Sequence, residues 1–183
     1  DIIGHISEVC EWSPVPVVVK EVGFGLDLHS AKELISAGVK ILDVAGTGGT
    51  RFADIEIELN KNISEILSKN DVFDNWGYTT TECLINISRA LPSTTCWASG
   101  GIRNGLDVAK SMCLGASAVG IAGRLLQPAT ESTDAVLKVM KQFCNELRIT
   151  CFGLGVGTAG DLNTSHILEG THADLGNGLV RYQ

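Results

Sequence analysis

Two glycine-containing stretches have the residue types of a phosphate-binding site. Gly100 and Gly101 follow a short apolar segment, and Ile102 and Arg103 lead from them into a helical pattern of apolar residues. Glycines leave backbone N–H groups accessible to an anion, and the amino-terminal end of the following helix carries a partial positive charge. The pair Ala122-Gly123 ends the next apolar segment in the same way. This spacing predicts that two consecutive loops bind one phosphate group.

A lysine and a threonine at the ends of two earlier apolar segments are further candidates. Lys20 ends a β-branched run, where a barrel directs side chains into its active-site mouth, and an ammonium there could stabilise negative charge on a bound ring or intermediate. The alternative is that Lys20 only extends into solvent. Thr50 closes a loop that contains Gly46, Gly48 and Gly49, and it adds a hydroxyl donor. No Ser/His/Asp set or pair of carboxylates can be assembled, so we assign no catalytic residue within this chain.

Strand-like segments alternate with helical patterns, which predicts a parallel sheet. After a helical pattern over 1–12, apolar segments lie at 15–20, 41–44, 96–98 and 118–121, and amphipathic patterns follow them at 30–38, 81–90, 104–112 and 132–148. The β-branched run at 15–20 is typical of a strand covered on both faces, and Ser30 with Glu33 has the pattern of a capping box. Four strands with about four helices are half of a (β/α)8 TIM barrel. We expect α/β architecture, with residues 1–183 as one domain that supplies roughly the carboxyl-terminal half of the barrel.

Three regions interrupt the alternation. Residues 51–75 are longer than a βα loop requires, with a helical pattern at 55–67, and either a functional insertion or a solvated spacer fits them. We expect a loop around Pro128, and a short helix with a partly irregular tail over 153–183. The chain begins at Asp1 inside a helical pattern, so we expect it to be a fragment.

Composition excludes several classes of function. The chain has 183 residues and a net charge of −7, and its basic residues are scattered, so we expect no nucleic-acid partner. No apolar stretch approaches the about 20 residues of a membrane helix, and we expect a cytoplasmic protein without a membrane partner. The six cysteines lack C-x-x-C spacing, which favours reduced core residues over disulfides or metal ligands.

Together the loops closely resemble those of type 2 isopentenyl-diphosphate isomerases, which are FMN-dependent TIM-barrel enzymes. The matching segments are Val-Lys-Glu-Val-Gly-Phe-Gly at 19–25, Asp-Val-Ala-Gly-Thr-Gly-Gly-Thr at 43–50, Trp-Gly at 76–77, Ala-Ser-Gly-Gly-Ile-Arg at 98–103 and Ala-Gly at 122–123. The resemblance implies reversible conversion of isopentenyl diphosphate into dimethylallyl diphosphate, with reduced FMN as the acid/base group. It also implies that NADPH reduces the flavin and that Mg²⁺ binds the substrate diphosphate. We expect a homo-oligomer that acts on this small-molecule substrate.

The resemblance assigns roles residue by residue. It implies that Lys20 and Thr50 contact the flavin, and that the loops of Gly100, Gly101, Ile102 and Arg103 and of Ala122 and Gly123 hold its phosphate. Ala45 stands where many members carry a small hydroxyl residue, and Arg51 stands where an asparagine is common. The family keeps its substrate-diphosphate cations and metal-binding glutamate in the amino-terminal half, so we expect this chain alone to be inactive. The alternatives are another FMN barrel, such as a 2-hydroxy-acid oxidase, and a non-catalytic half barrel that binds flavin or phosphate.

Overall fold

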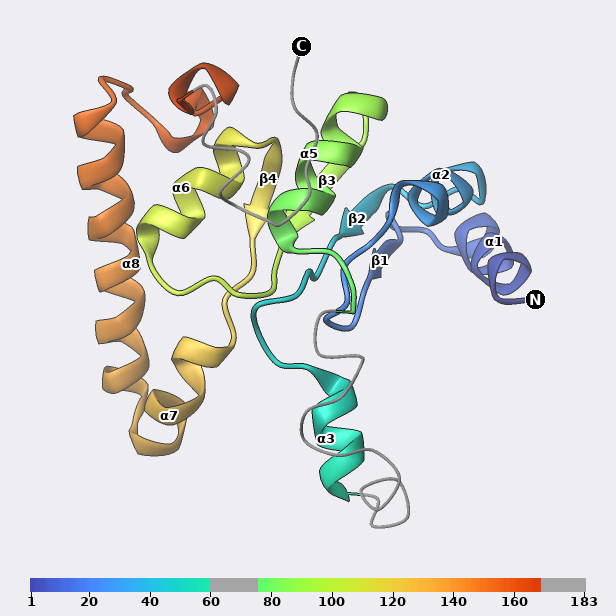
Figure 1. Ribbon diagram of the computed structural model, residues 1–183, viewed down its shortest axis with the longest axis horizontal. Helices are drawn as coiled ribbons and strands as arrows, with labels where there is room; N and C mark the ends of the chain where they lie inside the picture. The colour runs from blue at the N-terminus through green and yellow to red at the C-terminus, as the bar shows by residue number, and fades with distance from the viewer. Residues whose placement is uncertain (60–75, 169–183) are drawn as a thin grey trace.

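A four-stranded parallel sheet forms the centre of the computed structural model, which describes residues 1–59 and 76–168 (Figure 1). The strands pair in chain order, β1-β2-β3-β4, and they are β1 (Val18–Lys20), β2 (Ile41–Asp43), β3 (Thr95–Ala98) and β4 (Ala116–Val119). Parallel neighbours need a crossover connection, and helices supply it: α2 (Leu28–Ser36), α5 (Thr80–Ala90) and α6 (Gly105–Cys113). The sheet and these helices are successive βα units in the order that a barrel uses.

The core lies between the sheet and its helices. Leu42 and Val44 from β2 and its following loop pack with Leu84 and Ile87 of α5, and Cys96 of β3 completes the centre. All five are almost fully buried, and their burial determines which face of α5 packs against the sheet.

The remaining helices extend this layer. Helix α1 (Ile2–Trp12) contacts α2, the long α8 (Thr133–Gly153) packs against α6, and α7 (Gly123–Glu131) packs against α8 (Figure 1). Helix α3 (Phe52–Leu59) projects from the sheet, and two short 3-10 turns, η1 (Ala159–Asp161) and η2 (Thr164–His166), follow α8. None of the helices in the described ranges has both the length and the apolar character that crossing a bilayer requires.

Strand β1 differs from its prediction. It covers only Val18–Lys20 rather than 15–20, and Val18 is exposed instead of covered on both faces. The prediction was wrong because β1 is an edge strand within the described residues, so β-branched composition alone did not imply burial. Strand β4 also begins two residues earlier than expected, at Ala116.

Helix α2 begins earlier than the capping-box pattern indicated. Asp27, not Ser30, is the N-cap: its Oδ1 accepts hydrogen bonds from the N–H groups of His29 at 2.8 Å and Ser30 at 3.1 Å. Asp27 Oδ2 also accepts a hydrogen bond from the Ser30 hydroxyl at 2.6 Å. The Ser30 hydroxyl is therefore bonded to Asp27, and Ser30 lies within the helix.

Two further predictions near the carboxyl end were wrong. Residues 123–131 form helix α7 with Pro128 inside it, not a loop, because the fixed φ of proline is compatible with a helix that loses one hydrogen bond there. Helix α8 continues past 148 to Gly153. The helix expected at 55–67 begins at Phe52, and its part beyond Leu59, like the tail beyond 168, lies outside the described residues.

The cysteines follow the prediction for reduced thiols. All six are free, and those of 83, 96, 113 and 151 are buried in the core. Burial raises the pKa of the Cys83 thiol to about 12 and that of Cys96 to about 11, so both stay protonated at neutral pH. Cys144 was wrongly placed in the core, because it lies on an exposed face of α8.

Candidate functional site

Lys20, Asp43 and Ser99 meet where the first three strands end. Lys20 is the last residue of β1, Asp43 the last of β2, and Ser99 directly follows β3. Lys20 Nζ donates a hydrogen bond to Asp43 Oδ2 at 2.9 Å and to Ser99 Oγ at 2.5 Å. Ser99 Oγ in turn donates to Asp43 Oδ1 at 2.6 Å. The three side chains therefore form a closed hydrogen-bonded ring across three strands, which we call the Lys20 ring.

The Lys20 ring holds a cation at the open rim of the sheet. The Lys20 side chain is 55% exposed, whereas that of Asp43 is 12% exposed. A lysine ammonium has three donors, and Asp43 and Ser99 take two of them on the protein side. No other described side chain accepts a hydrogen bond from Lys20, so its third donor is available to a group bound above the strand ends, where barrel enzymes place their ligands.

The loop after β1 is shaped by one carboxylate. Glu21 Oε2 accepts hydrogen bonds from three consecutive N–H groups, those of Gly23 at 2.7 Å, Phe24 at 2.6 Å and Gly25 at 3.0 Å. The Phe24 carbonyl oxygen then accepts a hydrogen bond from Tyr78 N at 2.7 Å. These contacts explain why Glu21 and the glycines that follow Lys20 occur together, because they fold the loop tightly beside the Lys20 ring.

The glycine loops after β2 and β3 touch through their backbones. Gly46 N donates to the Ser99 carbonyl oxygen at 3.1 Å. A Cβ atom on Gly46 would overlap the backbone nitrogen of Thr80, and one on Gly100, whose φ is +91°, would overlap the carbonyl oxygen of Gly46. The Thr80 hydroxyl, at the start of α5, shares its one proton between two carbonyl oxygens, those of Ser99 at 2.7 Å and Gly100 at 2.8 Å. Small residues are required here because two main chains and a helix end meet.

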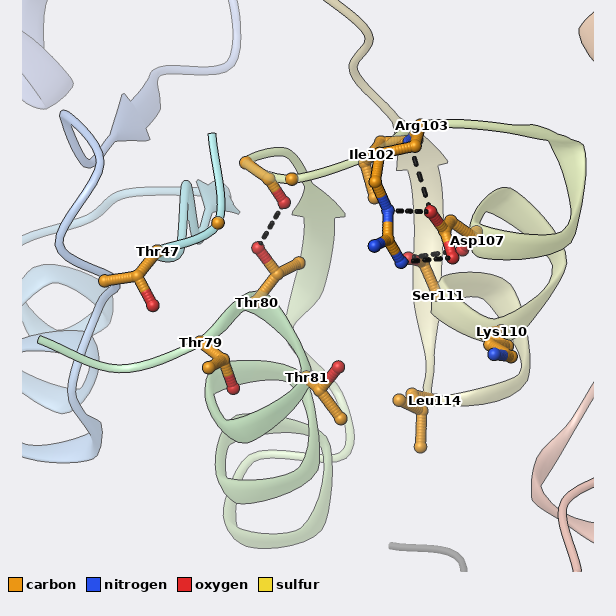
Figure 2. A pocket seen from close by; sticks show the side chains of 13 residues that line it. Thr47, Thr79, Thr80, Thr81, Ile102, Arg103, Asp107, Lys110, Ser111 and Leu114 are labelled. Atoms are coloured by element: carbon orange, nitrogen blue, oxygen red, sulfur yellow. Dashed lines mark hydrogen bonds and ion pairs between the residues drawn. The ribbon is translucent and has the colours of Figure 1, made fainter. Parts of the chain in front are cut away.

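A pocket of about 230 Å³ lies between the starts of α5 and α6 (Figure 2). Threonine side chains line it on the α5 side, while Arg103, Asp107 and Lys110 line it on the α6 side. Arg103 Nε donates to Asp107 Oδ2 at 2.9 Å and Nη2 donates to Oδ1 at 3.3 Å, and this hydrogen bonding to the Asp107 carboxylate raises the pKa of Arg103. The pocket collects Gly100, Gly101, Ile102 and Arg103 along one wall.

The start of helix α7 is an open backbone end. Ala122 is its N-cap and supplies no side-chain hydrogen bond, and no described atom lies within 4 Å of a Cβ placed on Gly123. The first N–H groups of a helix carry partial positive charge and lack partners inside the helix, so an anion can bind them. Barrels frequently bind phosphate with the loops after their last two strands and the start of a short extra helix, and α7 is a short helix that follows the loop after β4.

Most of the residues singled out from the sequence gather at the rim, but two important ones were missed. Lys20 reaches the glycine loop after β3 through its hydrogen bond to Ser99, whereas the Thr50 side chain is exposed. Asp43 and Ser99 lie in the matching segments at 43–50 and 98–103, but neither of them is assigned a role from the sequence. The available signal was their position, because Asp43 lies near the carboxyl end of the segment predicted at 41–44 and Ser99 directly follows the one at 96–98. The part of the chain that the structure describes contains no cluster of three or more His, Cys, Asp or Glu side chains that could hold a metal ion.

The sequence also matches a known protein family along most of its length. Positions 3–169 match the FMN-dependent dehydrogenase family. The chain belongs to this family. It is also a homologue of isopentenyl-diphosphate delta-isomerases, with 40% identity to that of Oceanobacillus iheyensis over 173 residues and 43% to that of Pseudescherichia vulneris over 165 residues. The resemblance seen in the loops is therefore confirmed.

These relatives are about twice as long as this chain. The two alignments cover 91% and 90% of the chain but only 48% and 47% of the relatives. The chain thus spans about half the length of the isomerases that it matches.

Solved structures of low sequence identity share the fold of this family. A soluble variant of (S)-mandelate dehydrogenase from Pseudomonas putida has a TM-score of 0.70 at 18% identity, over 90% of this chain and 40% of that one. A flavocytochrome b2 variant with benzoylformate has a TM-score of 0.70 at 19% identity, over 98% of this chain and 41% of that one. The prediction of a parallel α/β fold that forms part of an FMN-dependent TIM barrel is confirmed.

Proposed function

We propose that this chain is the FMN-binding part of an enzyme that interconverts isopentenyl diphosphate and dimethylallyl diphosphate. The observation that carries the proposal is about 40% identity to curated isomerases along nine-tenths of the chain, combined with the Lys20 ring and the glycine loops at one rim. Fold likeness alone would not separate an isomerase from a dehydrogenase. We propose residues 1–183 as part of a single barrel domain.

The residues present at the rim fit FMN. The Gly100 to Arg103 loop and the open start of α7 at Ala122 and Gly123 offer backbone N–H groups to a phosphate, and Arg103 adds a cation beside them. Thr50 would offer a hydroxyl at the outer side of the flavin. Only glycine allows the main chains of the β2 and β3 loops to approach as they do at Gly100, which keeps the loop surface free of side chains.

Lys20 would control charge next to the flavin. When bound, reduced FMN supplies the acid/base group for moving a proton between the two carbon positions of the substrate. An ammonium beside the ring stabilises negative charge on it, and Asp43 and Ser99 hold that ammonium at the strand ends. We propose that NADPH maintains the reduced flavin and that Mg²⁺ binds the substrate diphosphate, with metal ligands on a part of the enzyme that this chain lacks. We further propose a homo-oligomer.

A hybrid protein tests the function. This chain is joined to the part of the Oceanobacillus iheyensis isomerase with which it does not align, and conversion of isopentenyl diphosphate is followed with FMN under reducing conditions. We expect turnover by the hybrid and its loss in Lys20→Met, with little or no turnover by the chain alone. A folded, FMN-loaded hybrid that oxidises a 2-hydroxy acid, or that converts neither substrate, would contradict the proposal.

A further inference from the structure

We propose that Ser99 and Asp43 are positioning residues that fix the Lys20 ammonium against the ring of bound FMN. The inference rests on the proposed FMN site and assigns two residues beyond it. Ser99 is the central member, because its single hydroxyl accepts from Lys20 Nζ at 2.5 Å and donates to Asp43 Oδ1 at 2.6 Å.

Lysine needs such support because its side chain is long and flexible. Holding a lysine side chain in one conformation costs rotamer entropy, more than for most other side chains. The half-exposed Lys20 gains two acceptors on the same side, and one of them is a carboxylate, which makes the stronger hydrogen bond. Because the acceptors come from two different strands, they fix the ammonium in two directions.

Ser99 is itself immobilised by the glycine loop. Its carbonyl oxygen accepts hydrogen bonds from Gly46 N at 3.1 Å and from the Thr80 hydroxyl at 2.7 Å. The Ser99 side chain is also closely packed, because Gly120 lies so near that a Cβ atom placed on it would be 3.1 Å from Ser99 Cβ. Ser99 therefore connects the proposed phosphate-binding loop to Lys20, so that one residue sets the position of both.

The direction of the hydrogen bonds excludes a different role for the same residues. A serine beside a lysine can act as a nucleophile when the lysine accepts the serine proton. Asp43 as a carboxylate can only accept hydrogen bonds, so the Ser99 hydroxyl, 2.6 Å from Asp43 Oδ1, donates to it and offers its lone pairs to Lys20 Nζ. This arrangement favours Lys20 as a hydrogen-bond donor to Ser99 over Lys20 as a base that takes the Ser99 proton.

The test compares the affinities of oxidised and reduced FMN for variants of the complete chain. The ratio of the reduced to the oxidised dissociation constant reports stabilisation of the reduced ring, and a tenfold rise corresponds to a fall of about 30 mV in the two-electron potential. We expect Lys20→Met to raise this ratio by about tenfold or more, and Ser99→Ala to raise it by about three- to tenfold. Added to Lys20→Met, Ser99→Ala should change nothing further, because its effect passes through Lys20.

Two further variants separate positioning from general disturbance of the sheet. Ser99→Thr retains the hydroxyl and should keep the ratio of dissociation constants at its wild-type value. Ser117→Ala removes a strand hydroxyl that donates to the Cys96 carbonyl oxygen at 3.0 Å, away from Lys20, and should leave the ratio unchanged. If Ser99→Ala loses its folded circular dichroism spectrum, Ser99→Cys, a weaker hydrogen-bond group of similar shape, replaces it with the same expected direction.

The outcomes distinguish this inference from the proposed function. Absence of saturable FMN binding by the folded wild-type chain would overturn the proposed function and the inference together. Normal FMN binding with an unchanged ratio of dissociation constants in Ser99→Ala would overturn only the inference. The inference would also be overturned if Ser99→Ala changed this ratio equally in the wild type and in Lys20→Met.

Discussion

Replacement of Gly100 by alanine tests the contact between the two glycine loops. Gly100 has a φ of +91°, and its added Cβ would overlap the carbonyl oxygen of Gly46, which belongs to the backbone and cannot rotate away. The backbone amide of Gly46 is fixed in turn, because it donates to Ser99 O at 3.1 Å. The variant must therefore separate the loops after β2 and β3 or distort one of them.

The structure gives the size of the effect. A non-glycine residue in left-handed backbone conformation costs about 1–2 kcal/mol, and forcing a methyl group into a packed site costs about 1–3 kcal/mol. Reduced flexibility of the unfolded chain returns about 0.4–1 kcal/mol. We expect Gly100→Ala to lower the free energy of unfolding by about 1–4.6 kcal/mol, which corresponds to a Tm decrease of about 2–18 °C for a chain of this size.

Urea and thermal unfolding followed by circular dichroism measure this change. Gly123→Ala is the matched control, since no described atom lies within 4 Å of the added Cβ and the residue lies in a helix, where alanine is favoured by about 0.5–1 kcal/mol. Gly100→Ala with a stability within 0.5 kcal/mol of wild type would refute the described contact between the loops.

Three other predictions concern the backbone, a helix cap and the cysteines. Ala45 has a φ of +35°, and glycine in its place relieves about 1–2 kcal/mol of backbone strain. The lost burial of a methyl group and the greater flexibility of the unfolded chain offset this gain, so Ala45→Gly should leave the free energy of unfolding within about 0.5 kcal/mol of wild type. A loss above about 2 kcal/mol in urea unfolding would contradict this prediction. Asp27→Ala should destabilise the chain by about 1 kcal/mol at pH 7. The hydrogen bond from the Ser30 side chain lowers the pKa of Asp27, so the stabilising effect of Asp27 is fully present above its unfolded pKa of about 4. In thermal unfolding, the difference between wild type and variant should begin to shrink as the pH falls below about 4, and it should vanish only below the lower pKa of the folded state. Iodoacetamide at pH 8 should modify the exposed Cys144 before Cys83, whose pKa burial raises to about 12, and peptide mass spectrometry showing the reverse order would contradict the described burial.

Local patterns were sufficient to predict most elements and half of the site. The amphipathic face of α5 and the apolar β2 and β3 were recognisable because they are buried together in one core cluster. The apolar face of α6 was recognisable because Ala109 and Cys113 are buried in a second cluster with Cys151 of α8. Lys20 and the Gly100 loop were found because they directly follow such segments. Helix α7 was missed because Pro128 is typical of a loop, although packing beside α8 outweighs one lost hydrogen bond.

The Lys20 ring could not be predicted because it depends on contacts between distant parts of the chain. Ser99 lies 56 positions from Asp43 and 79 from Lys20. Their meeting requires the pairing of β1 with β2 and β2 with β3, where Lys20 lies opposite Asp43 and Asp43 opposite Trp97. Sequence patterns locate strands, but this register depends on how the helices pack over them.

Titration of the purified protein with FMN tests the central claim, that the two glycine loops and Lys20 form a flavin site. Flavin fluorescence and visible absorbance report binding, and three proteins are compared: wild type, Gly123→Asp and Gly153→Asp. Both glycines have open space around the added side chain, but only Gly123 lies at the start of α7, where a carboxylate would repel the FMN phosphate. We predict saturable binding by wild type and Gly153→Asp and at least tenfold weaker binding by Gly123→Asp. A folded wild-type protein that does not bind FMN, or equal binding by all three proteins, would contradict the claim.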